Sequence, residues 1–335
     1  MRHGVDVAMS CGCAALASSS CPDSIACLSD KYIFPAAPIS DTATMRSLLW
    51  ILWEMIIKWP RRLLIDKLKR RAKLIYPPTT TPCVIQLTRH TMLKIGSHNI
   101  FNEAEAMRFI RARTNIPLPD VVDTWAINED YAYLVMERVE GVPLRDVFQK
   151  LSSAQKRTIA HELKAFVDQM RAIVVPPSHN YGARTGMIAS LKGGTFREDR
   201  FDDEYMGPFE DERAYHDWRV SVVQAISTRH QPTMERLRII RKELQDDHDI
   251  VFTHGDLNSG NVLIKVLGNG DVHIAAVLDW EMAGWRPAYW EYVKSMHCMG
   301  GCDTEWGEFV GMVLQKYEKE KALDDELQQL AGDAY

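Results

Sequence analysis

Three apolar runs interrupted by polar side chains constrain this chain more than any other feature. Residues 250–252 and 262–264 are typical of short buried strands, and they enclose a polar loop that contains residues 254–261. A third run, residues 272–278, follows the tight-turn sequence Gly268-Asn269-Gly270. A buried core cannot accommodate the carboxylates and amides of these segments without polar partners, so we expect the segments to surround a functional site.

Asp256, Asn261 and Asp279 are the residues of this region that most favour a bound cation. A divalent metal that carries phosphate fits them, because Mg²⁺ takes oxygen ligands from one or two carboxylates and completes its shell with phosphate oxygens and water. The three residues therefore predict a magnesium and phosphate site. A zinc hydrolase built on His254 and Asp256 is disfavoured, since the region lacks the further histidine and carboxylate ligands that catalytic zinc usually takes.

Length and composition are those of a soluble globular protein with no general attraction for nucleic acid. The 335 residues can form one large domain or two lobes with a sizeable core. The net charge of −5 gives no general attraction for nucleic acid, so no nucleic-acid partner is expected. Seven cysteines without a regular spacing favour a reducing compartment, and we expect the protein to be cytoplasmic.

The segment before residue 140 predicts a small antiparallel sheet with one helix. Its hydrophobic runs are separated by polar turns, as in two successive hairpins. The expected strands are residues 83–87, 91–95, 121–125 and 131–136. Between the hairpins, Asn102 can cap a helix that runs towards Arg113.

The remainder of the chain predicts a larger, mainly helical region around the polar segment. Ser152-Ser153 is expected to cap a core helix, and residues 285–335 are mostly helical by pattern. Residues 178–215 are loop-like, with an acidic stretch from Glu198 to Glu212. We interpret this stretch as a solvated face in preference to a site that attracts a cationic acceptor.

The first 75 residues lie outside this pattern. Residues 1–45 are expected to be a disordered leader, because polar residues break any apolar run long enough for a secretory signal. Residues 46–75 predict an amphipathic, basic helical segment whose apolar first half is too short to span a bilayer. Two interpretations stay open: weak contact of residues 46–73 with an anionic membrane surface, or a helix packed on the main domain with solvated cations. The second is favoured, because one sequence cannot show which face is buried.

Two motifs place this pattern in a known family. Residues 254–261 (HGDLNSGN) followed by residues 278–281 (LDWE) resemble the catalytic loop and metal site of the aminoglycoside phosphotransferase and choline kinase-like family, relatives of the protein kinases. With Glu103–Phe109 and Met136–Gly141, they are most similar to its fungal phosphotransferase branch. The resemblance covers about residues 83–320.

The resemblance implies an α+β, two-lobed protein-kinase-like fold. Residues 76–140 would form a small antiparallel-sheet N-lobe that binds nucleotide. Residues 141–335 would form a larger, mainly helical C-lobe with the catalytic loop, metal site and substrate site. The implied activity is an ATP- and Mg²⁺-dependent transfer of the γ-phosphate to a hydroxyl of a small-molecule acceptor.

The family motif also assigns roles to single residues. Asp256 would orient and deprotonate the acceptor hydroxyl, while Asn261 and Asp279 would hold Mg²⁺. His254 belongs to the catalytic set, and we expect it to brace the loop by hydrogen bonding more than to act as a base. Glu281 would add a weaker contact near the metal.

Nucleotide binding is assigned to the small lobe and to the catalytic loop. Lys94 would contact the α- and β-phosphates, with Glu103 as its helix partner and Glu105 as the alternative partner. The remaining nucleotide-binding positions are the hinge residues Met136, Glu137 and Val139, and the loop residue Asn258.

One departure from the family pattern concerns the loop that should cover the phosphates. Residues 76–82 (YPPTTTP) stand where a glycine-rich loop is expected, and prolines offer no amide donors. The first strand of the small lobe is either missing or supplied by residues 72–76. The alternative function is therefore a catalytically weak or inactive kinase-like nucleotide-binding module.

Overall fold

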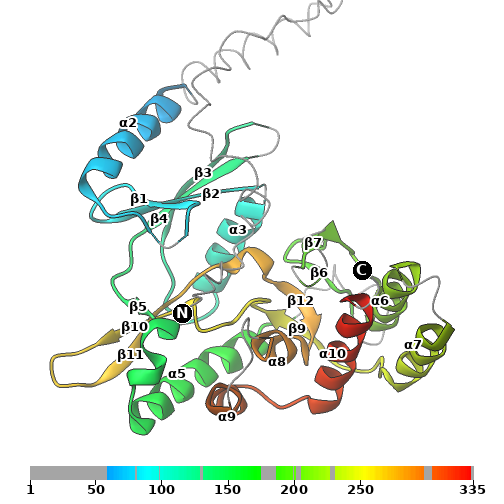
Figure 1. Ribbon diagram of the computed structural model, residues 1–335. Helices are drawn as coiled ribbons and strands as arrows, with labels where there is room; N and C mark the ends of the chain where they lie inside the picture. The colour runs from blue at the N-terminus through cyan, green and yellow to red at the C-terminus, as the bar shows by residue number, and fades with distance from the viewer. Residues whose placement is uncertain are drawn as a thin grey trace, which may run out of the picture.

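The chain forms two lobes, a small one built on a sheet and a larger one rich in helices (Figure 1). The computed structural model describes residues 59–79, 81–97, 99–128, 131–174, 186–198, 200, 205–226, 231–297 and 304–332. The predicted leader and the apolar start of the basic helical segment lie outside these ranges. The division into an antiparallel-sheet lobe and a mainly helical lobe confirms the predicted α+β class.

The small lobe is a four-stranded antiparallel sheet in the order β1-β2-β4-β3. Its strands are β1 (Val84–Gln86), β2 (Thr91–Gly96), β3 (Val121–Ala126) and β4 (Ala132–Glu137). These are the strands of the two predicted hairpins, because each apolar run is separated from the next by a polar turn. The helix α3 (Asn99–Arg111) contains Asn102 within its body, so the prediction that Asn102 caps it is wrong.

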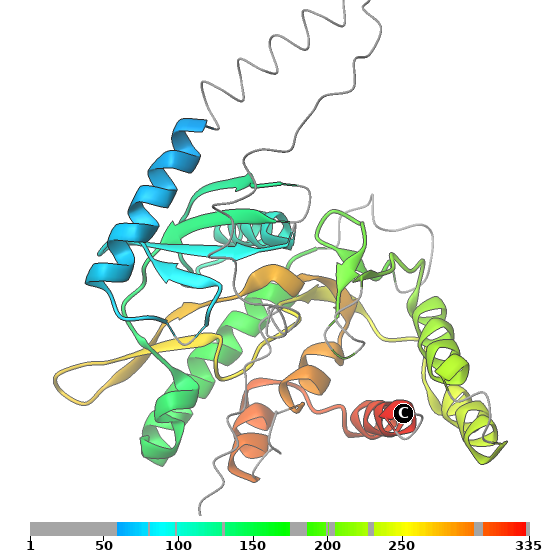
Figure 2. The ribbon, with the colours of Figure 1, turned by 45° about the horizontal axis from the view of Figure 1, so that its top comes forward.

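Two helices cover opposite faces of this sheet, which the alternation of side chains along β4 makes possible. Ala132 and Leu134 join the buried cluster that includes α3, whereas Tyr133 and Val135 pack in the cluster that includes Ile65 of α2 (Trp59–Ile75). Figures 1 and 2 show α2 lying along the outer side of the sheet. Because α2 is helical through Ile75, the prediction that residues 72–76 supply a further strand is wrong.

The larger lobe surrounds the polar segment with helices and short strands. Its helices are α4 (Leu144–Val147), η4 (Phe148–Lys150), α5 (Ser153–Arg171), α6 (Glu212–Ile226), α7 (Gln231–Glu243), η6 (Trp280–Met282), α8 (Trp290–Ser295), α9 (Thr304–Val313) and α10 (Glu318–Gly332). Its strands are β5 (Val142–Pro143), β6 (Ala189–Ser190), β7 (Phe196–Arg197), β8 (Tyr205–Met206), β9 (Ile250–Thr253), β10 (Val262–Val266), β11 (Val272–Val277) and β12 (Gly284–Pro287).

The helix α5 begins where its sequence predicts. The Ser152 hydroxyl accepts a hydrogen bond from the Gln155 N–H, and the Gln155 side chain accepts one from the Ser152 N–H, which completes a capping box. Within the described ranges, no helix is long and apolar enough to cross a membrane.

Short strands between and after the predicted elements hold the polar segment in place. β12 pairs with both β9 and β6, although residues from Trp285 onward were predicted to be mostly helical. Gly284 permits this pairing, because a Cβ at that position would lie 2.5 Å from the Ala189 carbonyl oxygen. β6, β7 and β8 lie in the stretch predicted as loop.

Candidate active site

The polar segment forms a loop between β9 and β10 at the junction of the lobes. Gly255 turns this loop with φ at +86°, in the left-handed region where residues with side chains are strained. A Cβ there would also lie 2.5 Å from the Met282 carbonyl oxygen. The glycine of the motif is therefore required both by the turn and by the close approach of η6.

His254 braces the loop through both ring nitrogens. Its Nε2 lies 2.9 Å from the Leu278 carbonyl oxygen, which can only accept, and its Nδ1 lies 3.2 Å from the Asp256 N–H, which can only donate. These partners place the proton on Nε2. Burial lowers the pKa of the fully buried ring, so His254 stays neutral. This geometry agrees with the expected bracing role.

Glu291 of α8 is a fully buried carboxylate that the motif gave no reason to select. Its Oε2 accepts hydrogen bonds from the N–H groups of His254 (2.8 Å) and Gly255 (3.4 Å), and its Oε1 accepts from Leu257 (3.2 Å). One side chain thus fixes three backbone N–H groups within four residues of the loop. A signal existed in the sequence, because an acid in the apolar run 289–293 needs buried partners.

Replacing Glu291 with glutamine should loosen this loop. The NH₂ group of glutamine must face at least one of the N–H donors, which leaves a buried donor unpaired at about 1–3 kcal/mol of unfolding free energy. We expect that loss together with a fall in the turnover rate of up to about 10²-fold, because a shift of the loop misplaces Asp256. Thermal unfolding and turnover rates measure both. Glu210→Gln, which removes an exposed carboxylate, is the control and should match wild type.

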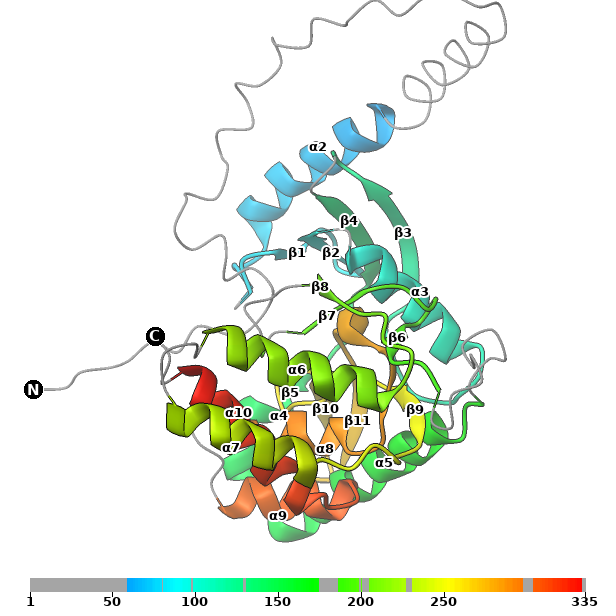
Figure 3. The same cartoon turned by 90° about the vertical axis from the view of Figure 1, so that its right-hand side faces the viewer.

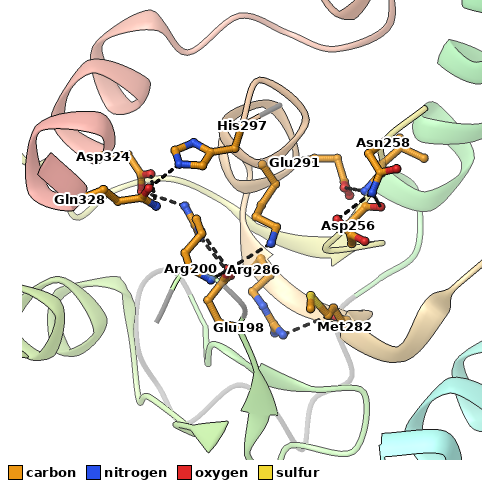
Figure 4. Close-up of polar contacts among 12 residues, drawn as sticks. Glu198, Arg200, Asp256, Asn258, Met282, Arg286, Glu291, His297, Asp324 and Gln328 are labelled. Carbon is orange, nitrogen blue, oxygen red and sulfur yellow. Dashed lines mark hydrogen bonds and ion pairs between the residues drawn. The ribbon is translucent and has the colours of Figure 1, made fainter. Parts of the chain in front are cut away.

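Asp256 is held by two asparagines of its own loop. Asn258 donates from Nδ2 to Oδ1 at 3.0 Å, and Asn261 donates from Nδ2 to Oδ2 at 2.9 Å. Figure 4 shows Asp256 beside Asn258. Asn258 also accepts the Gly260 N–H at 2.8 Å, so its side chain is engaged within the loop. Because the side-chain nitrogen of Asn261 donates to Asp256, the side-chain oxygen Oδ1 is the atom of this amide left for a cation.

Strand pairing brings Asn261 and Asp279 to the same end of one hairpin. Val262 of β10 pairs with Val277 of β11, and the Leu278 N–H donates to the backbone carbonyl oxygen of Asn261 at 2.8 Å. Asp279 follows directly, with φ at +65°, which is rare for a residue with a side chain and is typical of functional positions. The predicted pair of metal ligands is therefore adjacent, and an oxygen donor set of this kind fits Mg²⁺.

Lys94 of β2 joins the small lobe to this hairpin. Its Nζ lies 2.7 Å from Asp279 Oδ1, 2.8 Å from Glu103 Oε2 and 3.0 Å from Glu281 Oε2. Glu103 of α3 is thus the carboxylate paired with Lys94. The alternative, Glu105, instead pairs with Lys192 at 2.5 Å.

An excess of carboxylates surrounds Lys94. One oxygen each of Glu103, Asp279 and Glu281 lies within 4.8 Å of the others, and Arg197 of β7 lies 3.4 Å from Glu281. Burial raises the pKa of Glu103 to about 8, while Lys94 holds the pKa of Asp279 below its usual range despite burial. At neutral pH the raised pKa keeps Glu103 largely protonated, so Asp279 and Glu281 balance Lys94 and Arg197. A divalent cation bound there would favour the ionised form of Glu103, which would make a third oxygen ligand available.

Two residues that the motif did not reveal position Glu281. Arg197 pairs with its side chain, and Asn102 of α3 donates from Nδ2 to its carbonyl oxygen at 2.8 Å. Asn102 thereby links the small lobe to η6, which explains a polar residue on the inner side of α3. Both contacts join segments distant in sequence, so local patterns could not indicate them.

The predicted hinge lies at the end of β4. Met136 and Glu137 are its last residues, and the Arg138 N–H that follows donates to the His90 carbonyl at 2.7 Å. The Val139 N–H makes no backbone hydrogen bond to any residue in the described ranges. A free backbone donor at this position is available to a ligand.

The acidic stretch contributes two buried carboxylates, where we predicted a solvated face. Glu198 pairs with Arg200 at 2.9 Å and with Lys294 at 3.1 Å. Arg200 lies between Glu198 and Asp324 in Figure 4 and contacts Asp324 at 2.8 Å. Glu212 accepts from His248 at 2.8 Å. These carboxylates are neutralised inside the lobe, so neither attracts a cationic acceptor.

The sequence profile of the Phosphotransferase enzyme family matches residues 89–330, which is more than two thirds of the chain. The chain belongs to this family. The match includes Lys94, Glu103 and the whole Asp256 to Glu281 region. No functionally curated protein has a sequence that matches this chain significantly.

Solved structures show the same fold for this phosphotransferase-family chain. The ADP-bound aminoglycoside phosphotransferase APH(2'')-Ib has a TM-score of 0.53 and 13% identity, over 75% of this chain and 81% of that chain. The GDP and kanamycin complex of APH(2'')-IIia has a TM-score of 0.52 and 12% identity, over 74% and 80%. The protein-kinase-like, two-lobed α+β fold is thereby confirmed.

Proposed function

We propose that this protein transfers the γ-phosphate of ATP to a hydroxyl of a small molecule, with Mg²⁺ as cofactor, in the cytoplasm. The observation that supports this most is the meeting of Lys94, Glu103 and Asp279 at one point, next to the loop that holds Asp256. One similar protein was solved with GDP and kanamycin, a nucleotide and a small molecule, in this fold. The buried thiol of Cys83 is compatible with a reducing compartment.

Each residue of the site has a role in this reaction. Asp256 accepts the proton of the acceptor hydroxyl, whose oxygen then bonds to the γ-phosphorus while the bond to the bridging oxygen of ADP breaks. Asn258 and Asn261 orient Asp256, and His254 braces the loop. When bound, Mg²⁺ neutralises charge on the phosphate oxygens, and Asn261 and Asp279 would hold it.

Nucleotide binding uses the small lobe and the hinge. Lys94 is held by Glu103 at the junction of the lobes, where its ammonium would contact phosphate oxygens. Met136, Glu137 and Val139 would border the adenine, with the Val139 N–H as donor. Asn258, which donates to Asp256 in the catalytic loop, would complete the nucleotide-binding set.

A catalytically weak nucleotide-binding module is the second candidate, and one observation favours it. The first described strand of the small lobe is β1, which is three residues long and follows the proline-rich residues 76–82. The β1–β2 turn, residues 87–90, contains no glycine whose backbone could wrap phosphates. ATP binding without transfer to any acceptor would establish this function instead.

Calorimetric titration with ATP tests the proposed cofactor set. We expect ATP to bind in the presence of Mg²⁺ and to bind much more weakly in EDTA. Asp279→Asn should remove most of the Mg²⁺ dependence, because it removes a charged metal ligand. Asp271→Asn, an exposed substitution at the far end of the same hairpin, is the matched control. Equal affinity with and without Mg²⁺ would contradict the proposal.

A further inference from the structure

The positive charge of this protein is concentrated on α2. The helix contains seven lysines and arginines and a single acid, Asp66, so its net charge is +6. Because the whole chain has a net charge of −5, the remainder of the chain has a net charge of −11. A basic helix on an otherwise acidic protein is a local feature that the catalytic site does not use.

One face of α2 is accounted for by packing on the sheet. Ile65 and Ala72 are 6% and 2% exposed, and Ile65 belongs to the buried cluster with Trp125 and Tyr133. This packing confirms that the helix lies on the main domain, the interpretation that was favoured from the sequence.

The opposite face of α2 is apolar and exposed. Leu63 and Leu64 are 55% and 56% exposed, and Leu74 and Ile75 are 87% and 55% exposed. The two pairs are 11 residues apart, which is close to three helical turns, so they lie on the same side of the helix. Four exposed aliphatic side chains on one helix face form an apolar strip that packing within the described ranges leaves uncovered.

Cations lie along the same strip. Lys67, Arg70 and Arg71 fall between the two aliphatic pairs, are exposed, and form no ion pair within the described ranges. By contrast, Arg61 lies 3.5 Å from Asp123 and Lys69 lies over the Tyr133 ring, both towards the sheet. The outward face therefore combines aliphatic side chains with unpaired positive charge.

We propose that this outward face of α2, defined by Leu63, Leu64, Lys67, Arg70, Arg71, Leu74 and Ile75, docks the protein onto a membrane containing anionic lipids. Aliphatic side chains that enter the acyl boundary, flanked by cations that meet lipid headgroups, are the pattern of a helix lying in the interface. None of the seven residues that define this face is aromatic, so the face offers no ring on which bases could stack, which disfavours single-stranded RNA as the partner.

Two further observations agree with lipid as the partner. The sequence that precedes Lys58 and α2, residues 48–57, is LLWILWEMII, so a mostly apolar run lies on the N-terminal side of the helix. In addition, α2 lies on the sheet face opposite α3, and α3 is the helix that packs against η6, the element that follows Asp279 (Figures 1 and 3). A protein docked through α2 would therefore keep the catalytic residues on the side away from the membrane.

Vesicle cosedimentation of the full chain tests this proposal. Vesicles of phosphatidylcholine with about 30% phosphatidylserine should pellet the protein, and vesicles of phosphatidylcholine alone should not. Replacing Lys67, Arg70 and Arg71 with glutamine should weaken binding about a hundredfold, because each cation near an anionic surface contributes about 1 kcal/mol. Leu63→Gln with Leu74→Gln should also weaken binding, because it removes inserted apolar surface.

The matched control removes the same number of positive charges from the larger lobe. Arg157, Lys265 and Lys319 are exposed, and their joint replacement with glutamine should leave vesicle binding unchanged. Circular dichroism verifies that each variant folds. The proposal is overturned if wild type ignores anionic vesicles, if the α2 variants bind them as wild type does, or if the chain binds RNA and not vesicles.

Discussion

Asp256→Asn is expected to lower the rate of phosphoryl transfer by about 10²–10⁴-fold, the usual effect of a general base. Asparagine has nearly the same shape but cannot accept the acceptor proton. Turnover measured with saturating ATP and acceptor gives the rate, and calorimetry gives the ATP dissociation constant. We expect that constant to stay within about threefold of wild type, because Asp256 acts on the acceptor and not on the nucleotide.

Asn258→Ala is the companion variant for Asp256→Asn. It removes one of the two amide donors that orient Asp256 and keeps the carboxylate. Its loss of rate should be smaller, because Asn261 still holds the other oxygen. If Asp256→Asn turned over as fast as wild type, the assignment of Asp256 as the base would be wrong.

Lys94→Met is expected to lower the free energy of unfolding by about 3–5 kcal/mol, because it removes the cation from buried carboxylates. The side chains of Lys94 and Glu103 are only 5% and 2% exposed. The cost should grow above about pH 8, because Lys94 lowers the folded pKa of Glu103 and its removal raises that pKa further above about 8. Wild type stops losing stability once its folded Glu103 ionises, whereas the variant continues to lose it. Urea denaturation at pH 6 and at pH 9 measures both effects.

A double variant separates charge from packing in this prediction. Adding Glu103→Gln to Lys94→Met removes one uncompensated carboxylate, so it should recover part of the lost stability and reduce the pH dependence. ATP binding should stay weak in both variants, because the ammonium that meets the phosphates is missing from each. Equal stability of Lys94→Met and wild type at pH 8 would refute the buried ion pair.

Sequence patterns were sufficient where the determining interactions are local. Alternating apolar residues and polar turns predicted the two hairpins of the small lobe, and Ser152 predicted the start of α5. The spacing of Asp256, Asn261 and Asp279 predicted that the three residues lie close together, because the hairpin of β10 and β11 separates Asn261 from Asp279 and brings its two ends side by side.

The patterns were insufficient where contacts span the chain. Glu291 fixes the catalytic loop from 30 or more residues away, and Asn102 reaches Glu281 across the two lobes. The sequence predicted Glu198 on an acidic surface, because several acids lie near it in the chain. In the structure it is buried, and Arg200 and Lys294 neutralise it. A short strand such as β12 forms only because β9 and β6 flank it, so its own residues do not predict it.

The central claim is the transfer of phosphate to a small-molecule hydroxyl, and one measurement tests it directly. The purified protein is incubated with γ-³²P-ATP, Mg²⁺ and a deproteinised metabolite extract, and the products are separated by chromatography. The account predicts label in one or a few small molecules with wild type, and none with Asp256→Asn or in EDTA. Label that remains in ATP or appears only as free phosphate, while wild type binds ATP normally, would contradict it.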